Sequence, residues 1–523
     1  MSTISQKLSV IEKIGYSLGD LAANLVFQTL VTYLAYFYTV IYGLKNTDAS
    51  AITFSVGLIA AFAFNPIIGA LADRTNTRWG KFRPWILWTA IPLGVVALLA
   101  FSTPHFEYKG KVIYAVVTYS LLLLFYAANN LPYGALSGVI TGDMKERNSL
   151  SSYRFIAVMF AQFFVQVFML PIIMSAGNGD KAIGIEKVMT WLAILGTVML
   201  VITFLTTRER VIPDKNQQAS IKDDIKDLVK SRPWVIMLIL TILVFITLAM
   251  KGGSYVFYFN EYVDTPSLEA FLKPVLNLEF MQHLFLPEAV RQQVAEMKNN
   301  GVTDVITSLS ISDKQDYVRS IGFGLFNAGG IIMGLVGIAL SSRLANRYGK
   351  RDVFRTALFV STLFILAFAI FPPKNVGMMF LSQVLHGFFY GITTPVLWAM
   401  IADVADYSEW KNNRRATAIT FSAMLMGLKI GLSIGGALVT LLLGYYGYIS
   451  QERYLELHQM TKETFSQLKI VIQQPESVGI GAKWLVSIFP AIPFLLGAGL
   501  LFFYEINKQK EVQIETDLLE RRK

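Results

Sequence analysis

Hydrophobic residues gather in runs of about twenty along most of the chain, and shorter polar stretches separate the runs. A run of that length crosses a hydrocarbon core of about 30 Å as an α-helix. The strict alternation typical of membrane β-barrels is absent from the sequence. The pattern predicts an all-α polytopic membrane protein with twelve transmembrane helices, near residues 12–42, 49–72, 85–101, 112–140, 152–174, 188–207, 233–262, 319–341, 355–371, 377–402, 416–445 and 483–504.

A charged and polar stretch divides these helices into two sets of six, which predicts two six-helix bundles. We expect a first bundle at 1–207, a cytoplasmic linker at 208–231, a second bundle at 232–507 and a cytoplasmic tail at 508–523. Two long connections in the second half, 263–318 and 446–482, are expected on the extracytoplasmic side. Proline followed by helically spaced apolar residues predicts short surface helices in the first connection, which either covers the outer rim or serves as a lid or docking site.

Positive charge sets the predicted orientation, because Lys and Arg resist translocation. The short loops at 73–84, 141–154, 342–355 and 403–415 hold fifteen Lys and Arg residues, whereas the alternate loops at 43–48, 102–111, 175–187 and 372–376 hold six. Both termini are therefore expected in the cytoplasm.

A basic loop occurs twice, as GALADRTNTRWGKFRPWILW at 69–88 and as GIALSSRLANRYGKRDVF at 337–354. Arg74, Arg78, Gly80 and Lys81 recur 269 positions later as Arg343, Arg347, Gly349 and Lys350. Such a repeat, placed each time between long apolar runs, is typical of a duplicated carrier.

Composition narrows the function classes. The chain is 54% hydrophobic and 16% charged, and its net charge of +10 fits orientation and lipid headgroups rather than nucleic acid. It has no cysteine and four histidines, and it has no nucleotide-binding G-x-x-x-x-G-K-[ST] loop. The first apolar run is too long and too polar for a cleavable signal. We expect no cofactor, no metal and no catalysis.

Ionisable groups inside predicted membrane helices are candidates for function, because each is costly at a helix centre. Lys429 lies near the middle of one span, in SAMLMGLKIGLSIGG, and is either functional or part of a structural ion pair. Asp20 precedes Asn24 by one turn on the same helix face. Asp20 either has a functional role or makes a structural hydrogen bond between helices. Lys251 heads KGGSYVFYFNEY and either contacts substrate or extends toward the outer interface.

Amides add to this polar set. They bind sugar hydroxyls, and they equally join helices. Those in predicted spans are Asn24, Asn65, Asn129, Asn130, Gln162 and Gln166.

Charges of both signs lie at the expected inner face. Positive-inside signalling explains the Lys and Arg residues but not the carboxylates, so we predict a cytoplasmic gate of salt bridges between the halves. Its members are Asp73, Arg74, Arg78, Lys81, Arg83, Asp403, Asp406, Glu409, Arg414 and Arg415.

Several long motifs occur in a fixed order. They are Gly19-Asp20 with Asn24, YLAYFYTVIYGL at 33–44, ADRTNTRWGKFRPWIL at 72–87, NLPY at 130–133, YRF at 153–155, KGG at 251–253 and ADVADYSEWKNNRRA at 402–416. Through them the chain resembles the glycoside-pentoside-hexuronide cation symporters, the melibiose permease relatives within the major facilitator superfamily, over nearly its whole length apart from the two outer insertions. The resemblance therefore implies the major facilitator fold. The resemblance implies sugar or glycoside transport across the bacterial inner membrane by alternating access.

The resemblance also implies site residues. Arg154 and Lys429 match the family's cationic cavity residues, and Asn24, Asn130 and the surroundings of Asp20 match positions that grip sugar hydroxyls. Gly134 replaces a tryptophan of the family. A stacking platform is therefore expected from other rings, namely Tyr133, Tyr255, Tyr258 or Trp398.

The coupling ion stays open. Where the family places two aspartates on its second helix to bind a cation, this sequence has Ala61 and Asn65. Asp20 coupled to Lys429 would carry H⁺, Asn65 with backbone oxygens would bind Na⁺, and a facilitated uniporter would need neither.

Two other functions compete with sugar transport. A lysolipid carrier shares this fold, although the amides and charges favour hydroxyl recognition. A transporter-like nutrient sensor would need a longer soluble region than the 508–523 tail. We expect a monomer that contacts membrane lipids and a sugar, and no nucleic acid.

Overall fold

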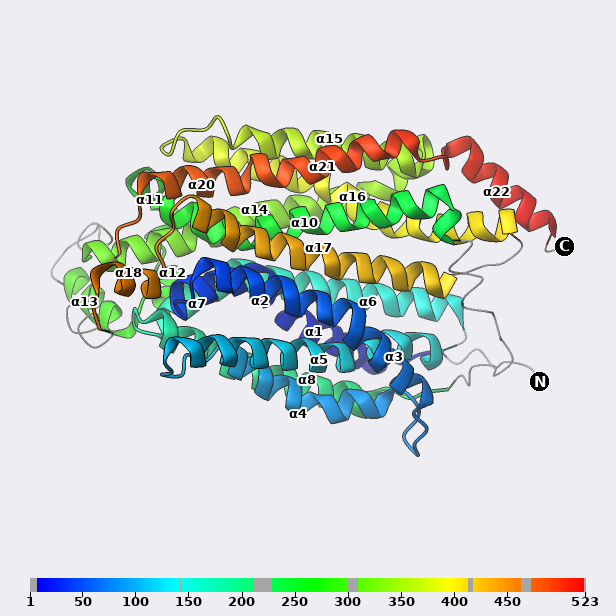
Figure 1. Ribbon diagram of the computed structural model, residues 1–523, viewed down its shortest axis with the longest axis horizontal. Coiled ribbons are helices and arrows are strands. Elements are labelled where there is room, and N and C mark those ends of the chain that lie inside the picture. The colour runs from blue at the N-terminus through cyan, green and yellow to red at the C-terminus, as the bar shows by residue number, and fades with distance from the viewer. Residues whose placement is uncertain are drawn as a thin grey trace. The chain divides into compact units, whose positions relative to one another are not determined.

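A computed structural model describes residues 7–141, 143–210, 228–299, 306, 309–412, 417–461 and 472–521. Its regular elements there are helices and one isolated β-bridge between Thr77 and Gly80 (Figure 1). Among the described residues, eleven helical segments are long and apolar enough to cross a membrane. The all-α prediction is confirmed. A twelfth helix covers much of the remaining expected span, and twelve crossings with cytoplasmic termini stay a prediction.

The chain forms two compact units. The first consists of Met1–Lys215 with two later segments, Leu272–Gly324 and Ile449–Gln473. In it, α1 packs against α6 and α8, and α4 packs against α5 and α8. Its long helices are α1 (Val10–Tyr36, continued by the π-helical η1, Phe37–Ile41), α2 (Asn46–Ile59), η2 (Ala60–Phe64), α3 (Asn65–Arg74), α4 (Arg83–Ala100), α5 (Tyr108–Ile140), α6 (Met144–Phe163), η3 (Phe164–Phe168), α7 (Met169–Ala176) and α8 (Lys181–Thr206).

Short helices from the two long connections also belong to the first unit. They are α12 (Glu279–Phe285), α13 (Glu288–Asn299), α18 (Gln451–His458) and the end of α11 (Thr265–Leu276). Phe285 of α12 stacks on Phe168 of η3 at 6.1 Å between ring centroids. Lys111 of α5 donates to Glu452 of α18 at 3.0 Å, and both side chains are buried. The expected surface helices are therefore present and fixed to helices near the start of the chain.

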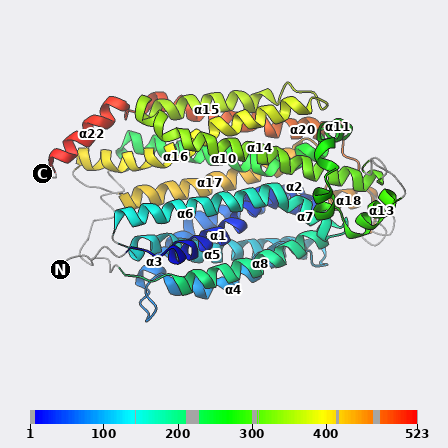
Figure 2. The same cartoon turned by 180° about the vertical axis from the view of Figure 1, so that it is seen from behind.

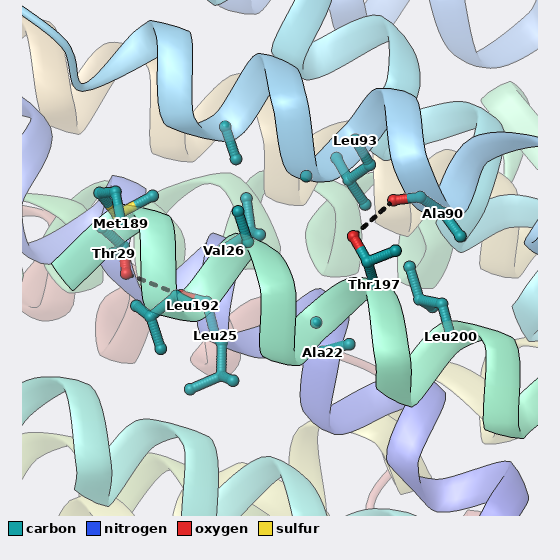
Figure 3. A pocket seen from close by; sticks show the side chains of 14 residues that line it. Ala22, Leu25, Val26, Thr29, Ala90, Leu93, Met189, Leu192, Thr197 and Leu200 are labelled. Carbon is teal, nitrogen blue, oxygen red and sulfur yellow. Dashed lines mark hydrogen bonds between the residues drawn. The ribbon is translucent and has the colours of Figure 1, made fainter. Parts of the chain in front are cut away.

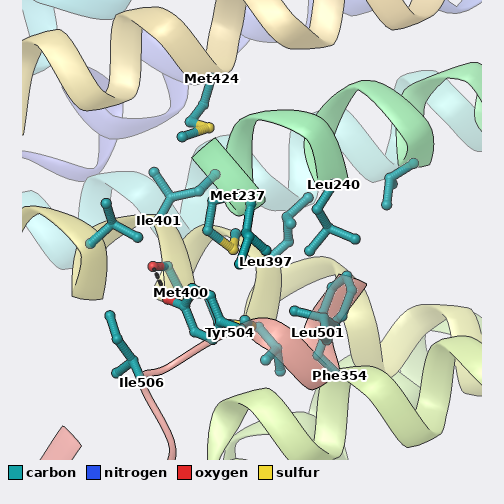
Figure 4. Close-up of a cluster of buried hydrophobic side chains, with 14 of the residues drawn as sticks. Met237, Leu240, Phe354, Leu397, Met400, Ile401, Met424, Leu501, Tyr504 and Ile506 are labelled. Atoms are coloured by element: carbon teal, nitrogen blue, oxygen red, sulfur yellow. Dashed lines mark hydrogen bonds between the residues drawn. The ribbon is translucent and has the colours of Figure 1, made fainter. Parts of the chain in front are cut away.

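The second unit consists of Asn216–Phe271, Leu325–Tyr448 and Gln474–Lys523. Figures 1 and 2 show α10 beside α17, and α15 packs against α16. A hydrophobic core joins its helices, with Met237, Leu240 and Met400 among the fully buried side chains (Figure 4). Its helices are α10 (Arg232–Glu261), α14 (Ile311–Tyr348) from Leu325 onward, α15 (Lys350–Ala367), α16 (Val376–Asn412), α17 (Thr417–Tyr445), α20 (Glu476–Val486), α21 (Ile488–Leu500), η5 (Leu501–Phe503) and α22 (Lys508–Arg521).

Glycine permits a close approach of α14 and α16. A Cβ added at Gly387 would lie 2.2 Å from the carbonyl oxygen of Gly330, and one at Gly391 would lie 2.1 Å from that of Gly334. Only a residue without a side chain fits there. The contact places the α16 residues just before Gly387, including Gln383 and His386, inside the second unit.

Two helices extend beyond their apolar segments into polar residues that were expected in loops. Residues 403–412, expected in a loop, continue α16, and 342–348 continue α14. Lys350 of α15 donates to Asp403 at 2.6 Å, so a polar contact supports this extension in place of hydrophobic burial. The last predicted span instead breaks at Ser487, between α20 and α21.

Candidate functional site

An ion pair between two helices is the centre of the polar cluster in the first unit. Nε of Arg154, on α6, donates to Oδ2 of Asp20, on α1, at 2.9 Å. Asp20 is 5% exposed, so its charge depends on this partner. Among the described residues, the terminal nitrogens of Arg154 make no hydrogen bond to protein, which leaves several N–H donors available to a ligand.

Two stacked tyrosines support the guanidinium. The rings of Tyr16 and Tyr133 lie 4.6 Å apart with planes 11° from parallel, and Arg154 lies 5.6 and 5.3 Å from their centroids. Each hydroxyl donates to the other residue's backbone carbonyl, at 3.0 and 2.8 Å. Gly19 makes room, because a Cβ there would lie 2.6 Å from the Tyr133 ring. The platform is thus fixed at both ends.

A polar stripe continues along α1 at four-residue spacing. Asn24 donates to the backbone carbonyl of Asp20 at 2.9 Å and to its carboxylate at 3.1 Å. One turn further, Gln28 accepts from Gln166 of η3 at 3.3 Å. Amide, carboxylate and guanidinium groups in one row supply the donors and acceptors that a polyhydroxylated ligand needs.

The second unit holds a different cluster. Lys251 of α10 is buried, with Nζ 5.4 Å from the centroid of the Tyr255 ring. Tyr255 donates to Gln383 of α16 at 2.9 Å, and His386 lies 2.8 Å from the Ser361 hydroxyl of α15. Sequence reasoning singled out Lys251 and Tyr255 but missed Gln383 and His386, which periodicity alone marks only as polar residues inside a span.

Other predicted residues lie on α5, α16, α17 and α3. Asn130 is half-buried on α5 and makes no hydrogen bond to Asp20 or Arg154. Trp398 packs against the core of the second unit. Lys429 is half-buried on α17, and its carbonyl accepts from Ser433 at 2.8 Å. Asn65 is half-buried where η2 gives way to α3.

The first copy of the repeated loop is anchored by a carboxylate that sequence reasoning assigned to the linker. Glu209 accepts from the backbone N–H groups of Lys81, Phe82 and Arg83 at 2.8, 2.7 and 2.9 Å, and so caps α4. Arg83 also donates to the carbonyl of Phe204 at 2.6 Å. Gly80, with φ of 112°, is needed because a Cβ there would lie 2.5 Å from the Glu209 carboxyl carbon.

The remaining loop residues are partly described. Arg74 and Arg78 are exposed, and Arg78 lies 4.9 Å from the Trp79 ring centroid. In the second copy, Lys350 contacts both Asp403, at 2.6 Å, and Glu511, at 3.1 Å. Asp406 and Glu409 lie on the last turns of α16. The side chain of Asp73, and Arg414 and Arg415, lie outside the described residues, and the gate between halves stays a prediction.

Glu146, outside the membrane spans, has its pKa lowered by a neighbouring lysine. Lys13 donates to Glu146 at 2.8 Å, and together with the backbone N–H of Leu8 it lowers the pKa of that carboxyl. This contact ties the start of α1 to the start of α6, the two helices that carry Asp20 and Arg154.

A cavity among α1, α4 and α8 does not serve polar recognition (Figure 3). Its lining is apolar except for Thr29 and Thr197, whose hydroxyls donate to the backbone carbonyls of Leu25 and Ala90. Because both hydroxyls already donate to backbone carbonyls, Thr29 within α1 and Thr197 across to α4, this cavity differs in character from the Asp20 cluster.

The family follows from a match over most of the chain. The model for MFS/sugar transport proteins matches residues 15–287 and 319–508. The chain belongs to this family. It is 31% identical to the putative glycoside/cation symporter YagG of Escherichia coli, over 97% of this chain and 94% of that protein. It is also 31% identical to the inner membrane symporter YicJ of E. coli (94% and 91%) and 25% identical to the isoprimeverose transporter of Lactiplantibacillus pentosus (95% and 89%).

Solved structures agree on the fold. A bacterial homologue of the lysosomal transporter Spinster, in an inward-facing and occupied conformation, matches with a TM-score of 0.57. The match covers 96% of this chain and 97% of that one at 13% identity, a level that supports the transporter fold alone.

Proposed function

We propose that the chain is a cation-coupled secondary transporter that carries a glycoside across the bacterial inner membrane. Family membership and the eleven apolar helices among the described residues support the setting. The named activities of the relatives, glycoside/cation symport and isoprimeverose transport, support the substrate class.

The observation that carries the proposal is the Asp20–Arg154 pair on its tyrosine platform. Arg154 presents unused N–H donors beside the faces of two tyrosines, and Asn24 and Asp20 add acceptors one turn apart. Sugars are recognised by this combination, hydrogen bonds to hydroxyls and an aromatic face for the ring. An acyl chain would use none of these polar groups, which argues against a lysolipid.

Uptake into proteoliposomes tests the proposal. We expect purified protein to exchange radiolabelled isoprimeverose or methyl β-D-glucuronide across the membrane, and lysophosphatidylcholine not to compete. Arg154→Lys keeps the charge but loses the planar donor set, and we expect exchange to fall about tenfold or more. Lys187→Arg, at an exposed position on α8, is the matched control. Inhibition by lysolipid, or no exchange of either sugar, would reject the proposal.

A further inference from the structure

The face of α10 around Lys251 is buried and polar. Lys251, Ser254, Tyr255 and Tyr258 follow the i, i+3, i+4, i+7 spacing of one helix face. All are buried, with Lys251 8% exposed and Ser254 and Tyr258 fully enclosed. The hydroxyls of Ser254 and Tyr258 have no hydrogen-bond partner among the described residues. Such an arrangement is unusual for a helix that only needs to pack.

The sequence places few carboxylates on the helices around Lys251, and those it has lie near helix ends. The sole acidic residue of α10 is Glu261, ten positions after Lys251 and so about 15 Å further along the helix. The segment of α14 in this unit, α17 and α21 contain no Asp or Glu. In α15 and α16 the acidic residues are Asp352, Asp403, Asp406 and Glu409, all toward the ends that carry the Lys350–Asp403 contact.

Within the described part of the chain, Lys251 forms no ion pair with a carboxylate, and the titratable groups on the helices around it are mostly basic or phenolic. The Tyr255 ring under Lys251 carries the hydroxyl that donates to Gln383 of α16 at 2.9 Å, and His386 lies three positions later on the same helix, stacked on Tyr390 at 5.7 Å. Of the helices packed against α10, α17 contributes Lys429, and α20 contributes Lys483, which lies over the Tyr262 ring just after α10. The one carboxylate of α20, Glu476, is exposed at its first residue, near the Glu261 end of α10. Lys251 itself rests on the Tyr255 ring. None of these groups neutralises an ammonium.

An uncompensated ammonium in a bundle interior is unstable, whereas the neutral amine is not. Two basic groups near each other hold one proton more readily than two, because the second charge is repelled by the first. The idle hydroxyls of Ser254 and Tyr258 supply oxygen acceptors on the same face for the charged form. A site with these properties exchanges a proton when its access changes.

We propose that Lys251 and His386 form the proton-binding site that couples sugar movement to H⁺. The proton adds to the free electron pair of Nζ to give the ammonium, or to the imidazole nitrogen, and leaves by the reverse step without any other bond changing. This assignment rests on the proposed function and names its cation. It also moves coupling away from Asp20, because Asp20 is already neutralised by Arg154.

The test measures protons and sugar together. Proteoliposomes that contain the purified protein and the pH dye pyranine are given radiolabelled isoprimeverose, and the ratio of protons to sugar taken up is recorded. We expect Lys251→Gln to lose the proton signal from whatever sugar flux remains. Lys251→His, which restores a titratable base, should regain it with a pH profile shifted to lower pH. Lys483→Gln, which removes a lysine of the same unit, should leave the ratio unchanged.

The outcomes separate this assignment from the function on which it rests. An unchanged ratio in Lys251→Gln would overturn the assignment alone. If Lys251→Gln stops all flux, recovery of coupled flux in Lys251→His supports the proton role, and failure to recover overturns it. Absence of isoprimeverose and glucuronide exchange in the wild type would overturn the proposed function and the assignment with it. Loss of coupling in Asp20→Asn with a normal ratio in Lys251→Gln would return the role to Asp20.

Discussion

Asp20 with Arg154 in the first unit and Lys251 in the second are both buried ionisable sites in membrane helices, and among the described residues the first has a partner of opposite sign whereas the second has none. The carboxylate and guanidinium compensate each other at 2.9 Å and keep donors free for a ligand. Lys251 contacts an aromatic face. A compensated charge suits permanent recognition, whereas an uncompensated one suits a group that gains and loses its charge. The comparison predicts opposite responses when each is removed.

The largest effect is expected when one partner of the compensated pair is lost. Arg154→Met leaves the Asp20 carboxylate buried and alone, and we expect about 3–5 kcal/mol of destabilisation. Lys251→Met leaves no opposite charge buried without its partner. The melting temperature of this variant should therefore equal or exceed that of the wild type. Intrinsic tryptophan fluorescence on heating checks both, since the chain has no cysteine for thiol dyes. The double variant Asp20→Asn/Arg154→Met should regain part of the loss. Equal destabilisation by the two single variants would break the comparison.

The buried Lys111–Glu452 pair and the exposed Lys45–Glu456 pair, whose glutamates both lie on α18, give a second comparison between buried and exposed charges. Glu452→Gln removes the negative partner of Lys111 but keeps an oxygen acceptor, so we expect about 1–3 kcal/mol of destabilisation. Glu456→Gln is its control on the same helix, because the Glu456 side chain is 47% exposed in its contact with Lys45. Exposed pairs contribute at most about 1 kcal/mol. If the two variants melt alike, burial does not decide the strength of these pairs.

Glu209 accepts hydrogen bonds from three backbone N–H groups, which compensate its charge. Glu209→Gln retains the shape but loses one acceptor oxygen and the charge, so about 1–2 kcal/mol of local stability should be lost. Hydrogen exchange at the amides of Lys81, Phe82 and Arg83 should accelerate, because these three N–H groups bond Glu209. Glu186→Gln, exposed on α8, should leave them protected. Unaltered exchange in Glu209→Gln would show that another group caps α4.

The smallest effect concerns the pH dependence of Glu146. Lys13 lowers the pKa of this carboxyl below its ordinary value of 4.5, so its contribution to stability is complete above 4.5 and is lost as pH falls through the lowered pKa. The stability difference between wild type and Glu146→Gln should therefore shrink in acid. Melting curves from neutral pH to pH 3 measure it, with Glu296→Gln on α13 as the exposed control. A constant difference across that range would contradict the prediction.

The sequence predicts much of this molecule and fails where contacts are long-range or where polar groups replace burial. Hydrophobic runs locate the spans, and the Asp20–Asn24 spacing identifies one polar stripe. Neither reveals that Asp20 meets Arg154, 134 positions away, or that Glu209 caps a helix 126 to 128 positions before it. The end of α16 was expected as a loop because its residues are polar, and the Lys350–Asp403 contact supplies there what hydrophobic burial supplies elsewhere.

The buried pair of Lys111 and Glu452 has a consequence for synthesis. The two residues are 341 positions apart, so Lys111 leaves the ribosome long before its partner exists. The first unit is begun first and completed nearly last, and in the interval Lys111 of α5 has its Tyr42 contact but lacks the carboxylate that α18 supplies. A chain that stops in the linker, or a gene divided there, produces a first unit without its outer helices. Such a fragment should need the second fragment for protection from proteases even where its own six long helices have inserted.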